Sequence, residues 1–194
     1  MIIFPDGITI TDTEQMCLLH MVPDPEVWLL ASTIEKARLR REALIKDWRP
    51  RLFADPAVTE LPADAEDLCD LIMAHDAYKN RADADAALDP PIPLHKHNLA
   101  RYAAVDRSGT TVTLFAGGMD LTNIDVNCIL AYVQELDDWV LGALMGQINR
   151  GRKKMIAQYE PIIRADPSVT TMPAAETGLI AMIVARSDYQ RLGG

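Results

Sequence analysis

An internal repeat constrains the fold of this chain more than any other feature of its sequence. Residues 1–81 align without a gap on residues 112–192, at a constant separation of 111 positions. The matched pairs include Phe4 and Phe115, Gly7 and Gly118, Cys17 and Cys128, Trp28 and Trp139, Arg41 and Arg152, Trp48 and Tyr159, Pro50 and Pro161, and the segments ADPAVT (54–59) and ADPSVT (165–170). Agreement of this kind at one offset indicates a tandem duplication of one small unit.

The matched residues are mostly apolar, aromatic or turn-forming, which are the types that define a fold. None of the histidines is matched by a second histidine, since His20 aligns with Ala131 and His75 aligns with Arg186. The repeat therefore predicts a shared architecture, and it indicates no shared catalytic group.

Each repeat is expected to fold as a short β-hairpin followed by helices, so the predicted fold class is α+β, mainly α. The hairpin of repeat 1 would pair residues 2–4 with 8–10, and that of repeat 2 would pair 111–115 with 119–121, each around a glycine-containing turn. A short helix would follow in each repeat, because Thr11 or Asp12, and Thr122 or Asn123, are suitable N-caps.

A long helix is the main element predicted in each repeat. Asp24 fits its N-cap and Pro25 its first position. Apolar residues at three- and four-residue steps predict one inward-facing stripe, made of Val27, Leu30, Ala31, Ile34, Ala37, Leu44, Ile45 and Trp48. Pro50 and Pro161 are expected to end or kink the two long helices. A further helix is expected at 65–75.

The insert at residues 82–111 joins the domain 1–81 to the domain 112–194 and occurs only once. Residues 82–88 are expected to extend the preceding helix, and residues 89–93, DPPIP, to be extended with polyproline character. Residues 99–105 and 110–115 would form a second hairpin. Such an arm could reach a neighbouring subunit or fold onto its own chain, and the sequence favours neither.

The composition is ordinary for a globular protein, with 49% apolar and 24% charged residues. The longest apolar run, 179–185, is far below the roughly 20 residues that span a bilayer. The first residues lack the basic region of a signal peptide. We therefore expect no membrane association and no secretion by a signal peptide. The three cysteines show no CxxC spacing and are expected to be buried apolar residues.

His95 and His97 are the nearest approach to a metal-binding motif. On a strand, alternate residues share a face, so both imidazoles could serve one metal ion. No further ligand stands at a recognisable spacing, so we expect no metal site. Phosphate-binding glycine loops, nucleophile elbows and HExxH motifs are also absent from the sequence. The sequence therefore favours a non-enzymatic protein without a cofactor or a small-molecule substrate.

Basic residues are concentrated on the predicted long helices. They are Lys36, Arg38, Arg40, Arg41, Lys46, Arg49 and Arg51 in repeat 1, and Arg150, Arg152, Lys153 and Lys154 in repeat 2. Residues 55–89, by contrast, contain ten acidic residues and two basic ones. The net charge of −9 opposes nucleic-acid binding. Opposite charges at the two ends of a unit favour head-to-tail contacts between subunits, or packing of one repeat on the other.

Arg41 and Arg152 fall within the apolar stripe of both repeats, so each guanidinium requires a partner. Asp55 and Asp166 follow the two long helices. We hypothesise two structural ion pairs, Arg41–Asp55 and Arg152–Asp166. The further candidates for structural or interaction roles are Trp28, Trp139, Arg38, Arg40, Lys153 and Lys154.

The segments PEVWLLASTIEKARLRREALIKDW and DDWVLGALMGQINRGRKKMIAQYEP, each followed by ADPxVT and a helix with a tyrosine, resemble small structural proteins of tailed bacteriophages. The resemblance covers both repeats but not the insert. It implies a virion component (capsid-associated, neck or tail) that is made in the host cytoplasm and binds copies of itself or other virion proteins. The alternatives are a regulatory or nucleic-acid-binding module that uses the basic helices, and a metal-dependent enzyme that uses His95 and His97.

Overall fold

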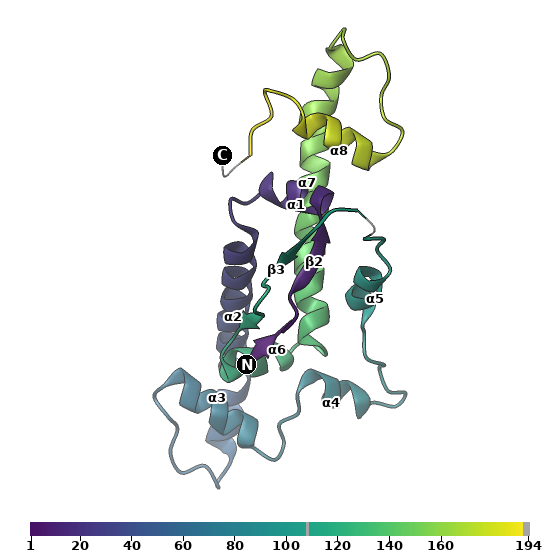
Figure 1. Ribbon diagram of the computed structural model, residues 1–194. Helices are drawn as coiled ribbons and strands as arrows, with labels where there is room; N and C mark the ends of the chain where they lie inside the picture. Colours follow the sequence, from purple (N-terminus) through teal and green to yellow (C-terminus); the bar gives the residue numbers. More distant parts are fainter. Residues whose placement is uncertain (108, 192–194) are drawn as a thin grey trace.

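The computed structural model describes residues 1–107 and 109–191 and is mainly helical, with two small antiparallel sheets. The order of elements is β1 (Ile2–Ile3), β2 (Ile8–Thr11), α1 (Asp12–Leu19), α2 (Pro25–Ala54), α3 (Ala65–Ala74), α4 (Arg81–Ala86), α5 (His97–Ala103), β3 (Thr111–Leu114), β4 (Met119–Asp120), α6 (Asn123–Leu130), α7 (Leu136–Ala165) and α8 (Glu176–Val184) (Figure 1). The prediction of a mainly helical chain with a few short strands is confirmed.

The two repeats have matching local structure. Helices α1 and α6, and helices α2 and α7, begin and end at positions 111 residues apart. The turns also match, since Phe4 and Phe115 both have a φ of 51° and Gly7 and Gly118 both have a positive φ. In each turn the glycine N–H donates to the phenylalanine carbonyl, at 2.8 Å in repeat 1 and 2.7 Å in repeat 2.

The predicted hairpins are wrong, because the strands of each repeat pair with those of the other repeat. Strand β1 pairs with β4, with Ile3 opposite Met119, and β2 pairs with β3, with Ile8 opposite Leu114. Strand β1 has only two residues, so a hairpin between β1 and β2 would contain few hydrogen bonds. The β2–β3 pairing extends over four residue pairs instead and buries Ile8, Ile10 and Leu114.

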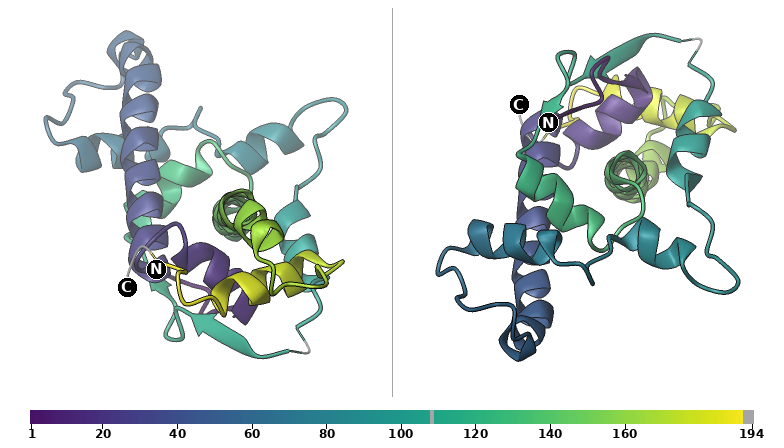
Figure 2. Two further views of the ribbon diagram at one scale, coloured as in Figure 1. Left: turned by 90° about the horizontal axis from the view of Figure 1, so that it is seen from above. Right: turned by 90° about the horizontal axis from the view of Figure 1, so that it is seen from below.

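The helices exchange between the repeats in the same way. Helix α1 of repeat 1 packs against α7 of repeat 2, and α6 of repeat 2 packs against α2 of repeat 1 (Figure 2). Both hydrophobic clusters therefore contain residues of both repeats. The cluster around α7 includes Ile10 and Leu18, and the cluster around α2 includes Cys128. Each repeat thus completes the core of the other.

The long helix α2 begins where the sequence predicts. The Asp24 carboxylate accepts hydrogen bonds from the backbone N–H groups of Glu26 and Val27, both at 3.0 Å. Of the two outcomes predicted for Pro50 and Pro161, an end of the long helix is wrong, because α2 continues past Pro50 and α7 continues past Pro161. The turn after each proline is anchored by one fully buried side chain, Leu52 in α2 and Ile163 in α7.

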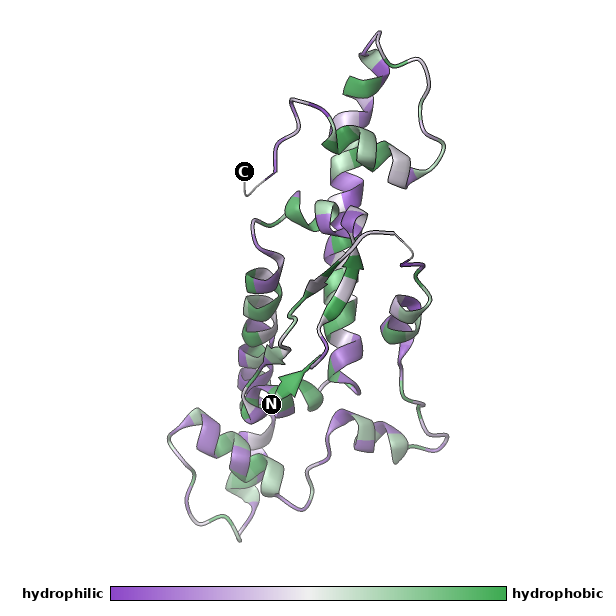
Figure 3. Cartoon of the chain, viewed as in Figure 1, coloured by the Kyte–Doolittle hydropathy of each residue, from purple (hydrophilic) through white to green (hydrophobic). Residues whose placement is uncertain are grey.

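The single inward stripe predicted for α2 is only partly correct. Ala37, Leu44 and Trp48 are buried, but Val27 is 64% exposed and Ile34 is 46% exposed. The first half of α2 packs in the cluster around α7. The second half packs with α3 and α6 in the other cluster, so the helix buries different faces along its length. Hydrophobic and hydrophilic residues accordingly alternate on its visible face (Figure 3).

The insert folds onto its own chain, and the helix extension and the second hairpin predicted for it are wrong. Residues 81–86 form the separate short helix α4, and residues 97–103 form helix α5 where a strand was expected. Leu99 and Tyr102 of α5 both pack on the cluster around α7. Residues three positions apart lie on the same face of a helix, so the helical conformation lets both side chains reach this cluster. No helix in the described part of the chain is long and apolar enough to cross a membrane.

Candidate functional site

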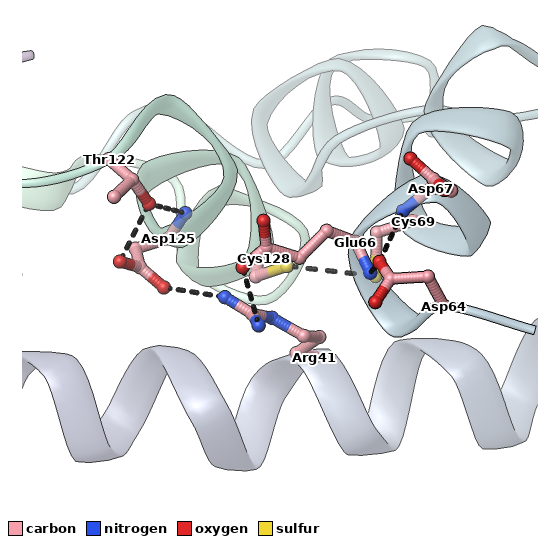
Figure 4. A network of polar contacts seen from close by, with 8 residues as sticks. All are labelled: Arg41, Asp64, Glu66, Asp67, Cys69, Thr122, Asp125 and Cys128. Carbon is pink, nitrogen blue, oxygen red and sulfur yellow. Dashed lines mark hydrogen bonds and ion pairs between the residues drawn. The ribbon is translucent and has the colours of Figure 1, made fainter.

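A polar network joins the two repeats where α2 crosses α6 (Figure 4). Arg41 Nη2 lies 2.9 Å from Asp125 Oδ1, and Arg41 Nη1 lies 3.1 Å from Glu66 Oε1. The Thr122 hydroxyl also donates to Asp125, at 2.7 Å. The side chains of Arg41 and Asp125 are only 20% and 13% exposed, so little water competes for this ion pair.

Two buried cysteines lie beside this network. The Sγ atoms of Cys69 in α3 and Cys128 in α6 are 3.9 Å apart, and both residues are fully buried. Hydrogen bonding with Cys69 lowers the pKa of Cys128 against the effect of burial, and the positive charge of Arg41 lowers it further. Cys17, Cys69 and Cys128 are all free and buried, as the sequence predicts.

The matched arginine of repeat 2 has a similar environment. Arg152 lies against Cys17, where burial raises the pKa of the thiol and the Arg152 guanidinium opposes that rise. Arg152 Nη1 is also 3.8 Å from Glu176 Oε2. Each matched arginine therefore lies beside the matched cysteine of the other repeat.

The hypothesised pairs Arg41–Asp55 and Arg152–Asp166 are wrong. Because the long helices do not end at their prolines, 14 residues of helix, or about 21 Å, separate Arg41 from Asp55. Asp55 instead contacts His75 Nε2 at 2.9 Å, and Asp166 contacts Arg186 at 3.2 Å. A backbone hydrogen bond from Ala57 lowers the pKa of Asp55, and His75 adds to this effect.

Most of the candidate basic residues on α2 have partners within the chain. Arg38 forms ion pairs with Glu35, at 2.7 Å, and with Glu42. The Arg40 guanidinium lies 4.6 Å from the centre of the Tyr132 ring, and Lys36 Nζ lies 5.9 Å from the centre of the Trp139 ring. These contacts are intramolecular, so these basic side chains of α2 interact with other groups of the same folded chain.

The other candidate residues are distributed between core and surface. Trp28 and Trp139 are half-buried and pack against the cluster around α7. Lys153 and Lys154 are exposed on α7. The structure therefore does not gather the sequence candidates into one site.

The histidines of the insert do not lie on a strand. His97 is the first residue of α5 and follows the N-cap residue Lys96, and His95 precedes both. All three side chains are exposed. Within residues 1–107 and 109–191, no three His, Cys, Asp or Glu side chains are arranged to hold a metal ion.

A cleft of about 650 Å³ lies between the insert and the start of α7, and its polar groups bind the insert to the helix. Gln134 Nε2 donates to the buried Asp85 at 2.6 Å. The carboxylate of Asp138 accepts from Asn98 Nδ2 at 3.1 Å and from the Leu99 N–H at 2.9 Å. These residues could not be identified from the sequence, because nothing in their local sequence indicates partners 39 to 49 positions away.

One face of the second half of α2 is open to solvent and partly apolar. It is lined by Glu42, Ile45, Lys46, Arg49, Pro50 and Phe53. Phe53 is 73% exposed, which is unusual for so large an apolar side chain. Phe53 could not be identified from the sequence because it stands outside the apolar stripe predicted for α2.

Comparison with protein-family models, curated proteins and solved structures gives no match to this chain. The function is therefore inferred from the molecule's own surface and from its sequence.

Proposed function

We propose that this chain is a non-enzymatic assembly protein that acts through protein–protein contacts. One observation carries the proposal, namely where the large exposed apolar side chains lie. Of the ten large exposed apolar side chains in the described part of the chain, four are on α2 and three are in the insert, with exposed fractions between 36% and 73%: Val27, Ile34, Leu39 and Phe53, and Leu88, Ile92 and Leu94. Exposed apolar residues that gather on particular segments are typical of interaction surfaces.

The proposal extends to a place in a bacteriophage virion, as a capsid-associated, neck or tail component. The support for this step is the resemblance of the two long helices and their ADPxVT segments to virion structural proteins. The proposed partners are copies of this chain and other virion proteins. Nucleic acid, membranes, small-molecule substrates and cofactors have no part in the proposal.

We also propose that the two repeats descend from one unit by tandem duplication. The support is the constant offset of the matched residues, the equivalent bounds of the helices and the equivalent turns. A single unit would have completed its core by exchanging β2 and α1 with a second copy in a twofold dimer. Fusion of two units would then hold both halves of that dimer in one chain.

Quantitative mass spectrometry of density-purified particles from the source culture tests the virion proposal. We expect the chain at a constant ratio to the major capsid protein across independent preparations. Absence from the particles would overturn the proposal. The regulatory module would then become the leading alternative, and salt-sensitive DNA binding would test it.

A further inference from the structure

Two of the three cysteines form a thiol pair at a contact between the repeats. The Sγ atoms of Cys69 in α3 and Cys128 in α6 lie 3.9 Å apart, and both residues are fully buried (Figure 4). Cys17 packs in the cluster around α7, whereas the pair lies in the cluster around α2. Cys69 and Cys128 therefore face each other across the boundary between repeat 1 and repeat 2.

The internal repeat contains the equivalent contact a second time without a thiol pair. Helix α6 packs on α3, and the matched helix α1 packs on α8 in the same way. At the constant offset of 111 positions Cys17 matches Cys128, but Ile180 matches Cys69. Cys17 and Ile180 both belong to the cluster around α7. An apolar side chain therefore suits this place in the fold, and packing alone does not require the thiol of Cys69.

The surroundings of the pair make one of its thiols more acidic than the other. A hydrogen bond with Cys69 lowers the pKa of Cys128 against the effect of burial, and the positive charge of Arg41 lowers it further. The same hydrogen bond, together with burial, raises the pKa of Cys69. Because the thiolate is the form of cysteine that reacts with oxidants, Cys128 is the more reactive sulfur atom, and Cys69 lies next to it.

We propose that Cys69 and Cys128 form a reversible disulfide that joins α3 of repeat 1 to α6 of repeat 2, with a peroxide as the oxidant. The Cys128 thiolate attacks hydrogen peroxide, so an S–O bond forms, the O–O bond breaks and the departing hydroxide takes up a proton. Cys69 Sγ then attacks Cys128 Sγ, so the S–S bond forms, the S–O bond breaks and the second hydroxide leaves with the proton of Cys69. Both thiols are oxidised, and the peroxide is reduced to water.

The position of α3 allows both the bond and the entry of the oxidant. The two sulfur atoms must approach by about 2 Å to reach the length of a disulfide bond. Helix α3 lies at one end of the molecule and packs mainly on α2 and α6 (Figure 1). Rotation of the two side chains and a small shift of α3 provide this approach. A transient opening of the same peripheral helix admits an oxidant as small as hydrogen peroxide.

The disulfide would stabilise the association of the two repeats. It would link residues 59 positions apart in the sequence, and a cross-link of this length restricts the unfolded chain. The inference goes beyond the proposed function and applies to any passage from reducing to oxidising surroundings. For the proposed virion component, that passage is release from the host cell. The test uses the purified chain, so its outcome is separate from the presence of the chain in particles.

Alkylation of the thiols after oxidation tests the bond. The full-length chain is reduced, exposed to hydrogen peroxide, unfolded and alkylated, and its intact mass then gives the number of free thiols. Cys69→Ile removes the pair and introduces the residue that repeat 2 has at the matched position, so we expect this variant to fold. Cys17→Ala is the matched control, because it removes the third thiol and leaves the pair intact.

We expect three free thiols in the reduced wild type and one, Cys17, after oxidation. Oxidised Cys17→Ala should have no free thiol, and Cys69→Ile should keep both of its thiols. Oxidation is expected to raise the Tm of the wild type and of Cys17→Ala by about 5–15 °C, and a reductant should reverse this rise. The Tm of Cys69→Ile should not rise, and this variant also controls for oxidation of methionines by the peroxide.

Peptide mapping of the oxidised wild type under non-reducing conditions identifies the bond directly, so the test does not depend on the folding of any variant. A linked peptide that contains Cys69 and Cys128 would support the inference. Three free thiols after oxidation, a link that involves Cys17, or oxygen added to Cys128 without a link would overturn it. A linked chain whose Tm does not rise, or an equal rise in Cys69→Ile, would overturn the stabilising effect of the bond.

Discussion

Arg41 of α2 and Asp125 of α6 form an ion pair between the two repeats, with Nη2 and Oδ1 2.9 Å apart. The pair stands where the long helix of repeat 1 crosses the short helix of repeat 2. Arg152, the match of Arg41, lies beside Cys17 of the opposite short helix. In each repeat the matched arginine therefore lies beside the short helix of the other repeat.

Replacement of Arg41 is expected to destabilise the fold more than replacement of a surface arginine. Arg41→Met leaves the largely buried Asp125 without its cationic partner, so we expect the free energy of unfolding to fall by about 2 kcal/mol. Arg38→Met is the matched control, because Arg38 lies on the same helix in exposed ion pairs, and we expect a loss below about 1 kcal/mol. Urea unfolding followed by circular dichroism measures both, and equal losses would contradict the role given to Arg41.

Two glycines of α7 are expected to respond to alanine in opposite directions. At Gly151 an added Cβ would stand 2.0 Å from the carbonyl oxygen of Cys17, so α1 would have to move away from α7. We expect Gly151→Ala to lower the free energy of unfolding by about 1–3 kcal/mol.

Gly146→Ala is the control, because the added Cβ would have no described atom within 4 Å apart from its chain neighbours and the nearby backbone of its own helix. The better helix propensity of alanine should raise stability there by up to about 1 kcal/mol. Thermal unfolding distinguishes the two variants. A stabilising Gly151→Ala would mean that α1 and α7 are less closely packed than this structure indicates.

Each repeat is expected to depend on the other for folding. A fragment of residues 1–89 lacks α7, against which α1 packs, and β3, which pairs with β2. Expressed alone, it should be unfolded or form an exchanged homodimer. Expressed together with a fragment of residues 90–194, it should co-purify and give the circular dichroism spectrum of the whole chain. A cooperatively folded monomer of 1–89 would contradict the exchange of elements.

The sequence predicts local structure here better than it predicts partners. Thr11, Asp24 and the matched Thr122 form the predicted caps, because a cap depends on only a few neighbouring residues. Strand pairing is different, since the same alternation of apolar residues suits a local hairpin and an exchanged pair equally.

The candidate site shows the same limit. The repeat identified Arg41 as a residue with a structural role, but its partner Asp125 stands 84 positions away in the other repeat. The exposed face of α2 around Phe53 could not be predicted for a related reason. A helical stripe predicts which residues face inward. It does not predict which apolar residues outside the stripe stay exposed, and the exposure of Phe53 follows only from the folded structure.

Acidification is expected to destabilise the fold through His20. This side chain is 5% exposed and packs on Tyr189 and Tyr159, with ring centres 6.0 and 6.3 Å apart, and neither ring nitrogen has a hydrogen-bond partner among the described residues. Burial lowers the pKa of His20, and the charge of Lys154 lowers it further. The unfolded chain therefore binds a proton at a higher pH than the folded chain, and stability should decrease as the pH falls below about 6.5.

His20→Phe should keep the packing on the two tyrosines and remove the titration. The free energy of unfolding of this variant is expected to depend less on pH between about 7.5 and 5 than that of the wild type. His97→Phe, at an exposed histidine, is the matched control and should keep the wild-type profile. Carboxylates such as Asp55 titrate equally in all three proteins, so the difference between profiles isolates His20. Equal losses of stability on acidification in His20→Phe and the wild type would contradict this prediction. They would mean that His20 binds its proton equally well in the folded and unfolded chains, whereas burial and the charge of Lys154 lower its pKa in the folded chain.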